Sequence, residues 1–262
     1  MSTKRDMGAV QELLLTLADD ELVLGHRDSE WTGHGPILEE DIAFSNIAQD
    51  ELGHSLVWYT LYEQLTGRTP DAMAFERDSG DFRSCRCVSY PKGDFAYTVV
   101  RQYLFDEAEQ VRLRSFRGSS HAPLSEAAAK IIREESYHLL HTRSLVERLG
   151  DATEESNRRM QAAVDTAFPQ ALGIFEHLES EEMLVRDGVF PGNTALLHEW
   201  MARVVPVLTA ATLNLPIRTQ QGRYVPTVTA DEGGRKGNHT EHLRTLVDDM
   251  QSVYRTSPGG HW

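Results

Sequence analysis

The sequence predicts an all-α protein: a four-helix bundle followed by additional helices. Long stretches carry apolar residues at helical spacing, and no part of the chain alternates strands with helices or repeats at a fixed period. The chain has 262 residues, of which 40% are hydrophobic, and this is ordinary globular composition. We expect one domain over residues 1–262, with the core bundle at about 10–149 and the extra helices at about 152–256.

Four long helices form the predicted bundle. Their expected ranges are about 10–28, 37–65, 94–117 and 123–149. Asp94 is the expected N-cap of the third helix, and Gly150 the expected C-cap of the fourth. Residues 68–93 are rich in Gly and Pro, which predicts a long crossover loop with a little strand at 85–88. Two antiparallel helical hairpins joined by a crossover are typical of a ferritin-like bundle.

Three more helices are expected after the bundle. The first covers about 153–183 with a kink at Pro169, the second about 194–213, and the third about 239–254. The stretch 215–237 is predicted to be loop. We interpret His239-Thr-Glu-His242 as a polar helix-cap region.

The charge balance excludes several classes of protein. The chain has 40 acidic residues against 26 basic ones, a net charge of −14, so it lacks the basic face that binding to nucleic acid requires. It shows no apolar run of about 18 residues that could span a membrane, and no signal peptide. Cys85 and Cys87 lie too close in sequence for a disulfide between them to crosslink distant parts of the fold. We therefore expect a cytoplasmic protein.

Two Glu-x-x-His motifs, Glu51–His54 and Glu135–His138, are the candidate source of chemistry. Residues three apart share a helix face, so a carboxylate and an imidazole can bind one metal ion together. About one such motif is expected by chance in a chain of this composition. Both motifs, however, fall in register with the apolar residues of their helices. Burial of a carboxylate without a partner costs several kcal/mol, so these motifs predict compensating cations.

A di-iron bundle takes one further carboxylate from each of the other two helices. On the first helix Glu21 continues the apolar line and precedes Glu51 by 30 residues. On the third helix Asp106 precedes Glu135 by 29 residues, and Glu109, one turn on, is the alternative. The predicted metal ligands are therefore Glu21, Glu51, His54, Asp106, Glu135 and His138. These donors suit two iron ions, and manganese as well.

No other cofactor site is predicted. The sequence has no Gly-x-Gly-x-x-Gly dinucleotide motif, no Walker loop and no four-cysteine cluster. If the bundle activates oxygen, its electrons must come from a separate protein.

Several segments resemble the C subunits of phenylacetyl-CoA epoxidases, the PaaC family, which are ferritin-like. The resemblance covers the chain from about Leu13 to its end, and the segment GGRKGNHTEHL at 233–243 is its most specific part. The other segments are GHRDSEWTGH at 25–34, RQYLFD at 101–106, Tyr137-His138, LVERLG at 145–150 and Met250-Gln251.

This resemblance implies a role in a cytoplasmic multicomponent monooxygenase that epoxidises the ring of phenylacetyl-CoA. The implied partners are a catalytic A-type subunit with a di-iron site, a small bridging B-type subunit, and a flavin and iron–sulfur reductase. A homodimer is the candidate state of the isolated chain.

The chain departs from the family in one respect. C subunits of this family generally have degraded metal ligands and serve as structural partners, whereas this chain keeps all six predicted ligands. Three readings stay open: a C-type subunit that binds metal, a scaffold subunit without metal, and an independent ferritin-like di-metal oxidase.

Overall fold

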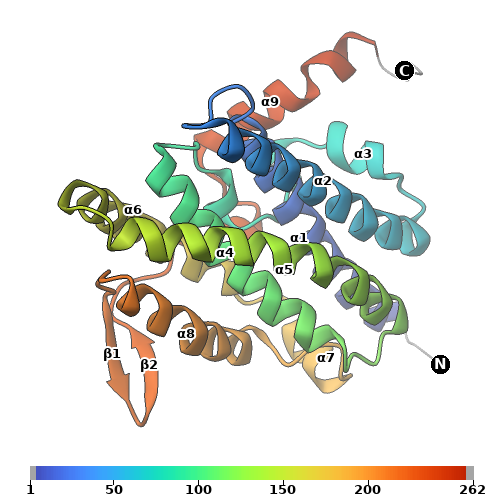
Figure 1. The fold of residues 1–262 in the computed structure, drawn as a ribbon. Coiled ribbons are helices and arrows are strands. Elements are labelled where there is room, and N and C mark those ends of the chain that lie inside the picture. The colour runs from blue at the N-terminus through green and yellow to red at the C-terminus, as the bar shows by residue number, and fades with distance from the viewer. Residues whose placement is uncertain (1–3, 258–262) are drawn as a thin grey trace. The chain divides into compact units, whose positions relative to one another are not determined.

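The structure is a computed structural model that describes residues 4–257, with side chains from residue 8 (Figure 1). That part of the chain contains nine α-helices, short 3-10 turns and one two-stranded sheet. The helices are α1 Lys4–Ser29, α2 Leu38–Thr66, α3 Pro70–Phe75, α4 Phe95–Phe116, α5 Ala122–Gly150, α6 Glu154–Leu172, α7 Glu181–Arg186, α8 Asn193–Ala210 and α9 Glu241–Thr256. The all-α prediction is confirmed, and the order of long helices is that of a ferritin-like fold.

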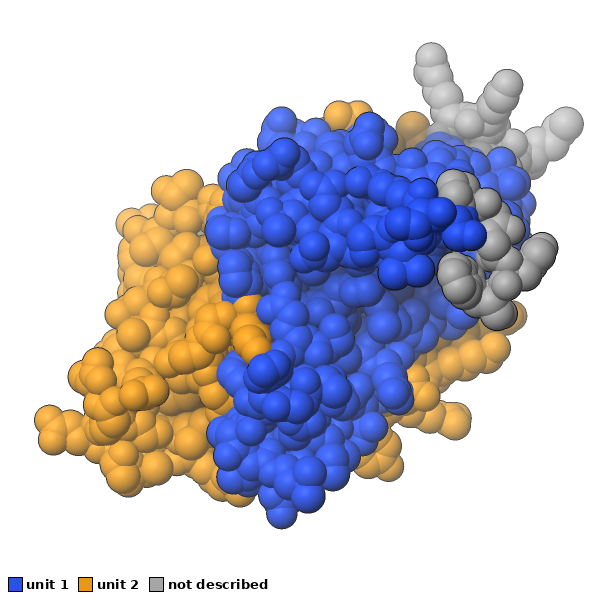
Figure 2. Space-filling model, turned by 90° about the horizontal axis from the view of Figure 1, so that it is seen from above, with its two compact units in different colours: residues 1–91, 233–262 blue, residues 92–232 orange. Residues whose placement is uncertain are grey.

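The chain divides into two compact units, coloured separately in Figure 2. Unit 1 combines residues 1–91 with residues 233–262, and unit 2 consists of residues 92–232. The predicted domain limits, 1 and 262, lie outside the described residues, and the single domain stays a prediction. Among the helices between residues 4 and 257, none has a stretch long and apolar enough to cross a bilayer.

In unit 1, α1 and α2 form an antiparallel hairpin. Gln11 near the start of α1 donates to the carbonyl of Leu65 near the end of α2, at 3.4 Å. Further along α1, the carbonyl of Ala18 accepts from the Ser55 hydroxyl at 3.0 Å. Contacts closer to the C-terminus of α1 are therefore made by residues closer to the N-terminus of α2, so the two helices are antiparallel.

The two helices of this hairpin approach most closely at Gly25. A Cβ atom at that position would lie 3.1 Å from the carbonyl oxygen of Ala48 and 3.1 Å from the Cβ of Glu51. Such contacts are tighter than a side chain normally tolerates, so glycine allows α1 to pass close to the part of α2 that carries Glu51.

In unit 2, α4 and α5 form the second hairpin, again antiparallel. Gln110 of α4 donates to Ser136 of α5 at 3.1 Å, and one turn earlier on α4 Asp106 accepts from Thr142. Helix α8 also packs on α4, because the Trp200 indole donates to the carbonyl of Leu104 at 2.9 Å. Helix α4 is buried along most of its length, so its polar side chains must find partners inside the protein.

Three predicted elements differ from the structure. Residues Arg86–Ser89 form a 3-10 turn in place of the expected strand, and α3 interrupts the expected crossover loop. The helix expected over 153–183 ends at Leu172. There the Pro169 carbonyl accepts from the Asp231 backbone, and a Cβ on Gly173 would lie 2.2 Å from the Asp231 carbonyl. This crossing segment therefore occupies the path of a longer helix.

Gly150 and the stretch 215–237 also depart from expectation. Gly150 is the last helical residue and not the C-cap, which is Asp151. A Cβ on Gly150 would lie 2.5 Å from the Ala211 carbonyl, so close packing requires this glycine. The expected loop contains an antiparallel hairpin, β1 Ile217–Gln220 and β2 Arg223–Pro226. Its two turn residues, Gln221 and Gly222, both have positive φ, as a tight hairpin turn requires.

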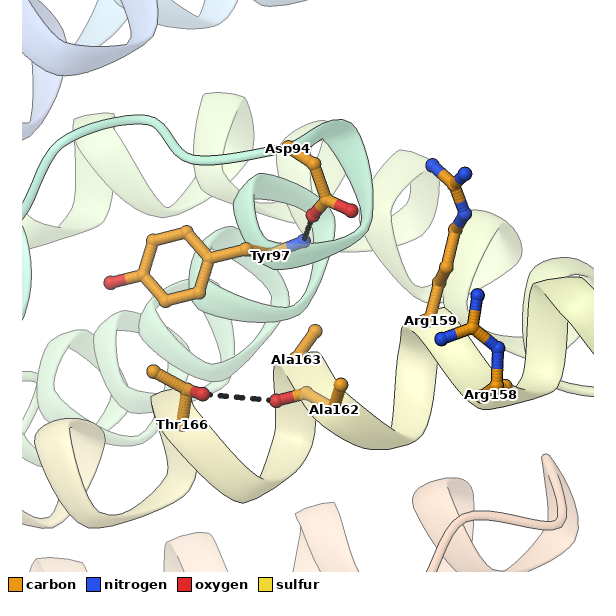
Figure 3. A pocket seen from close by; sticks show the side chains of 7 residues that line it. All are labelled: Asp94, Tyr97, Arg158, Arg159, Ala162, Ala163 and Thr166. Atoms are coloured by element: carbon orange, nitrogen blue, oxygen red, sulfur yellow. Dashed lines mark hydrogen bonds between the residues drawn. The ribbon is translucent and has the colours of Figure 1, made fainter.

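The predicted N-cap of α4 is confirmed and gives a test of the fold. The Asp94 carboxylate accepts from the Tyr97 backbone at 2.9 Å, as Figure 3 shows. Replacing Asp94 by Ala should lower the free energy of unfolding by about 1 kcal/mol, because a backbone donor of the first turn loses its partner. Urea unfolding measures the change. Replacement by Ser keeps a capping oxygen and should restore most of the loss; equal destabilisation by both substitutions would contradict the capping role.

Candidate metal centre

The unit 1 hairpin brings together three of the predicted metal ligands. Glu21 comes from α1, and Glu51 and His54 come from successive turns of α2. One ligand atom from each lies within 4.8 Å of the others. The Oε2 of Glu21 lies 3.9 Å from the Nδ1 of His54. We call these three residues the first ligand set.

Burial makes the first ligand set chemically unusual. Glu21 and Glu51 have no exposed surface and His54 is 2% exposed. Two carboxylates this close together and out of solvent repel one another, and a divalent cation between them relieves that repulsion. The Gly25 crossing described above explains how the two helices bring the carboxylates so near.

The unit 2 hairpin brings together the other three predicted ligands, which we call the second ligand set. Asp106 comes from α4, and Glu135 and His138 come from α5. The Nδ1 of His138 lies 3.3 Å from the Oε1 of Glu135, and Asp106 and His138 offer ligand atoms within 4.8 Å of one another. All three are buried.

Asp106 is held by two neutral donors. The amide of Gln102 donates to its Oδ1 at 2.9 Å, and the hydroxyl of Thr142 donates to its Oδ2 at 2.5 Å. Burial raises the pKa of Asp106 well above its usual value, and the neighbouring Glu135 carboxylate raises it further. A positive charge beside Asp106 and Glu135 would oppose this rise, because it favours the ionised form of both carboxyl groups.

The alternative ligand Glu109 has a different partner. Its carboxylate forms an ion pair with Arg112, one turn on along α4. An arginine already balances the charge of Glu109, whereas Asp106 receives only neutral donors and adjoins His138. The local geometry therefore favours Asp106 over Glu109 as the ligand from α4.

The donor types of both ligand sets suit the same metals. Each set combines two carboxylates with one imidazole, and carboxylates are hard anionic donors. Iron and manganese accept such mixed oxygen and nitrogen ligands, while a structural zinc or iron–sulfur site would use thiolates. The two cysteines, Cys85 and Cys87, are buried and belong to neither ligand set.

An open pocket of about 340 Å³ in unit 2 lies apart from the second ligand set (Figure 3). Arg158 and Arg159 line it, but both form ion pairs with the exposed Glu155. None of the predicted ligands lines this pocket. Its arginines are surface groups that already have a carboxylate partner.

The sequence did not predict several residues that hold the ligands in place. Gln102 and Thr142 contact Asp106 directly. Asp19 and Asp20, which precede Glu21, pair with Arg77 and Arg235. The signal available in the sequence was the adjacency of Asp19, Asp20 and Glu21, and the specific segment that contains Arg235. The polar contact expected at residues 239–242 is present, because the His239 ring contacts the Phe82 carbonyl at 2.9 Å, but Thr240, the N-cap of α9, forms no side-chain capping hydrogen bond.

Comparison with known proteins identifies relatives of this chain. A family model described as phenylacetic acid catabolic protein matches residues 1–262. The chain is 35% identical over 257 residues to the C subunit of 1,2-phenylacetyl-CoA epoxidase from Escherichia coli K12, covering 98% of this chain and 100% of that protein. It is 27% identical over 158 residues to the A subunit of the same enzyme, covering 60% of this chain and 51% of that protein. The chain belongs to the phenylacetic acid catabolic protein family.

Proposed function

We propose that this chain is a C-type subunit of a 1,2-phenylacetyl-CoA epoxidase and that each of its two ligand sets binds one metal ion, iron or alternatively manganese. One observation carries the metal proposal: in each helical hairpin, buried carboxylates adjoin a buried imidazole. Ligand atoms of Glu21, Glu51 and His54 lie within 4.8 Å of one another, and His138 lies 3.3 Å from Glu135 and within 4.8 Å of Asp106. The assignment to the epoxidase rests on the similarity to the C subunit along nearly the whole chain.

Each residue has a proposed task at its ion. Glu21, Glu51 and His54 hold one ion, and Asp106, Glu135 and His138 hold the other. Bound iron supplies dioxygen activation and the transfer of one oxygen atom to an aromatic ring.

The protein contributes position and shielding at these ions. Burial of both sets keeps bulk water away from the ligand atoms. Gln102 and Thr142 each occupy one oxygen of Asp106, so they fix the orientation of that carboxylate.

The proposed partners follow from the comparisons and from the absent redox motifs. The similarity to the A subunit supports a pairing with an A-type chain, as two related chains of one enzyme. A small bridging B-type subunit and a flavin and iron–sulfur reductase complete the proposed cytoplasmic complex. The reductase is required because this sequence carries no motif for a redox cofactor of its own.

A second candidate function is a scaffold subunit that binds no metal. The similarity to the C subunit is higher and covers more of the chain than the similarity to the A subunit, which favours a supporting role in the complex. The two candidates differ in what they expect of the ligands, and the following tests separate them.

The first test is metal content. Protein produced with iron should contain two metal ions per chain by elemental analysis. Substituting both Glu51 and His54 by Ala should remove one ion, since the first set then retains only Glu21. Glu147→Ala changes an exposed carboxylate of α5 that pairs with Arg143, and it should keep two ions. Wild-type protein without transition metal would reject the proposal.

The second test is turnover in the reconstituted complex. The Glu51→Ala/His54→Ala chain should assemble with its partners, because both residues lie inside the unit 1 hairpin. Turnover should fall about 100-fold or more if the metal takes part. Size-exclusion chromatography checks assembly and product formation checks activity. Full activity in an assembled complex would support the scaffold function.

The third test uses the charge of Asp106 in metal-free protein. The pKa of Asp106 is raised in the folded state, so the folded protein loses stability relative to the unfolded chain as pH rises through the unfolded value toward the folded one. Asp106→Asn removes this penalty. At pH 7 the variant should be more stable than wild type, because asparagine carries no charge to bury. The difference should vanish at a pH below about 4.

Urea titrations of chelator-treated protein at several pH values measure this effect. Asp165→Asn is the matched control, since Asp165 also accepts from a glutamine four residues earlier, Gln161, but on an exposed part of α6. The control should show no such gain. A wild type more stable than Asp106→Asn at neutral pH would contradict the charge argument.

A further inference from the structure

Two buried aspartates directly precede Glu21 on α1. Asp19 and Asp20 have no exposed surface. Arg77, from the crossover, forms a bidentate ion pair with Asp19: its two terminal nitrogens, Nη2 and Nη1, donate to the two carboxylate oxygens at 2.6 and 3.0 Å. Burial alone would lower the pKa of Arg77, but the Asp19 carboxylate beside it raises that pKa above its usual value.

Arg235 forms a bidentate ion pair with Asp20 in the same way. Its Nη1 and Nη2 donate to the two oxygens of Asp20, each at 2.7 Å. The same carboxylate accepts from the backbone of Cys85 at 2.7 Å, and Arg235 also donates to the Arg83 carbonyl at 2.9 Å. We call the Arg77–Asp19 and Arg235–Asp20 pairs the two clamps. The second clamp joins three distant segments of unit 1: α1, the crossover and the segment that precedes α9.

The glycines around Arg235 let its segment reach this position. A Cβ on Gly234 would lie 2.2 Å from the Ser84 carbonyl, and a Cβ on Gly237 would lie 2.4 Å from the Gly80 carbonyl. Gly237 also has φ of 75°, which other residues adopt at a cost. The specific segment 233–243 is therefore shaped to seat Arg235 against the crossover.

The two clamps act at two different angles around α1. Successive residues of an α-helix are about 100° apart around its axis, so Asp19 and Asp20 face different directions. The two ion pairs tie different sides of α1 to different segments, so together they oppose rotation of α1 about its axis and sliding along it. Glu21 follows about 100° further on, where it faces Glu51 and His54 of α2.

We propose that Arg77 and Arg235 are positioning residues that fix the rotation of α1 and thereby hold the Glu21 carboxylate in place beside Glu51 and His54. This inference rests on the metal-binding function proposed above. A bidentate Arg–Asp pair has a fixed fork geometry, while apolar helix packing tolerates small rotations. Metal ligation demands that precision, because displacement by about 1 Å weakens a site severely.

The test measures cobalt(II) binding to the whole chain by visible absorption and calorimetry. Arg77→Lys and Arg235→Lys keep the positive charge but lose the planar guanidinium that donates to both oxygens of the aspartate. Each should weaken cobalt binding at the first ligand set by about 10–100-fold and alter its absorption spectrum. Asp20→Asn, which keeps the carboxylate's shape, serves as a further variant if a lysine variant does not fold.

Arg27→Lys is the matched control. Arg27 is a buried arginine of α1 that donates to the carbonyls of Ser89 and His242, so it ties together the same chain segments. Its Nη1 pairs with Glu30, which follows the last residue of α1, and Arg27 lies about two helical turns beyond Asp20. Its substitution should lower the melting temperature by a comparable amount and leave cobalt affinity unchanged. Weakened binding in this control to the same degree would overturn the positioning role.

A second readout does not need metal. In metal-free protein, the ring signals of His54 in NMR spectra should shift in Arg77→Lys and Arg235→Lys but not in Arg27→Lys, because His54 adjoins Glu21. A wild type that binds no cobalt would reject the metal proposal, and the His54 signals would still decide the positioning role. Folded lysine variants with unchanged affinity and unchanged His54 signals would overturn the inference.

Discussion

Unit 1 depends on the burial of three consecutive acids on one helix. Asp19, Asp20 and Glu21 are all without exposed surface, and a buried carboxylate is costly unless a positive charge or strong donors meet it. Two of the three are met by arginines from distant segments. The crossover delivers Arg77, and the segment before α9 delivers Arg235. The need to place these two arginines beside α1 explains much of the irregular chain in unit 1, including the close backbone approaches at Gly234 and Gly237.

Unit 2 repeats the same pattern on α4. Asp106, Glu107 and Glu109 are all buried, with at most 1% of any exposed. Glu107 pairs with Arg203 of α8 at 2.7 Å, and Glu109 pairs with Arg112. Asp106 instead receives two neutral donors. In both hairpins, arginines thus pair with acids that lie close in sequence to a predicted ligand.

This pattern also explains how far the sequence could predict the site. Apolar periodicity predicted the four long helices and the register of both Glu-x-x-His motifs, because those signals are local. It left Asp106 and Glu109 as alternatives, because both lie on much the same face of one helix. The distinction comes from Arg112, Thr142 and Gln102, whose side-chain contacts depend on tertiary packing. The break after Leu172 had the same kind of cause, since the Asp231 segment that crosses there is distant in sequence.

The energetics of buried charge bear on the choice between a metal-binding subunit and a scaffold. Replacing buried ionic groups by apolar residues of similar volume is often neutral or stabilising, by about 1–4 kcal/mol. A scaffold that needs only a stable hairpin would therefore gain by losing Glu21, Glu51 and Glu135. This chain keeps them, and it adds Asp106 with a pKa raised by burial and by Glu135. Two bound cations would turn the repulsion between these carboxylates into attraction.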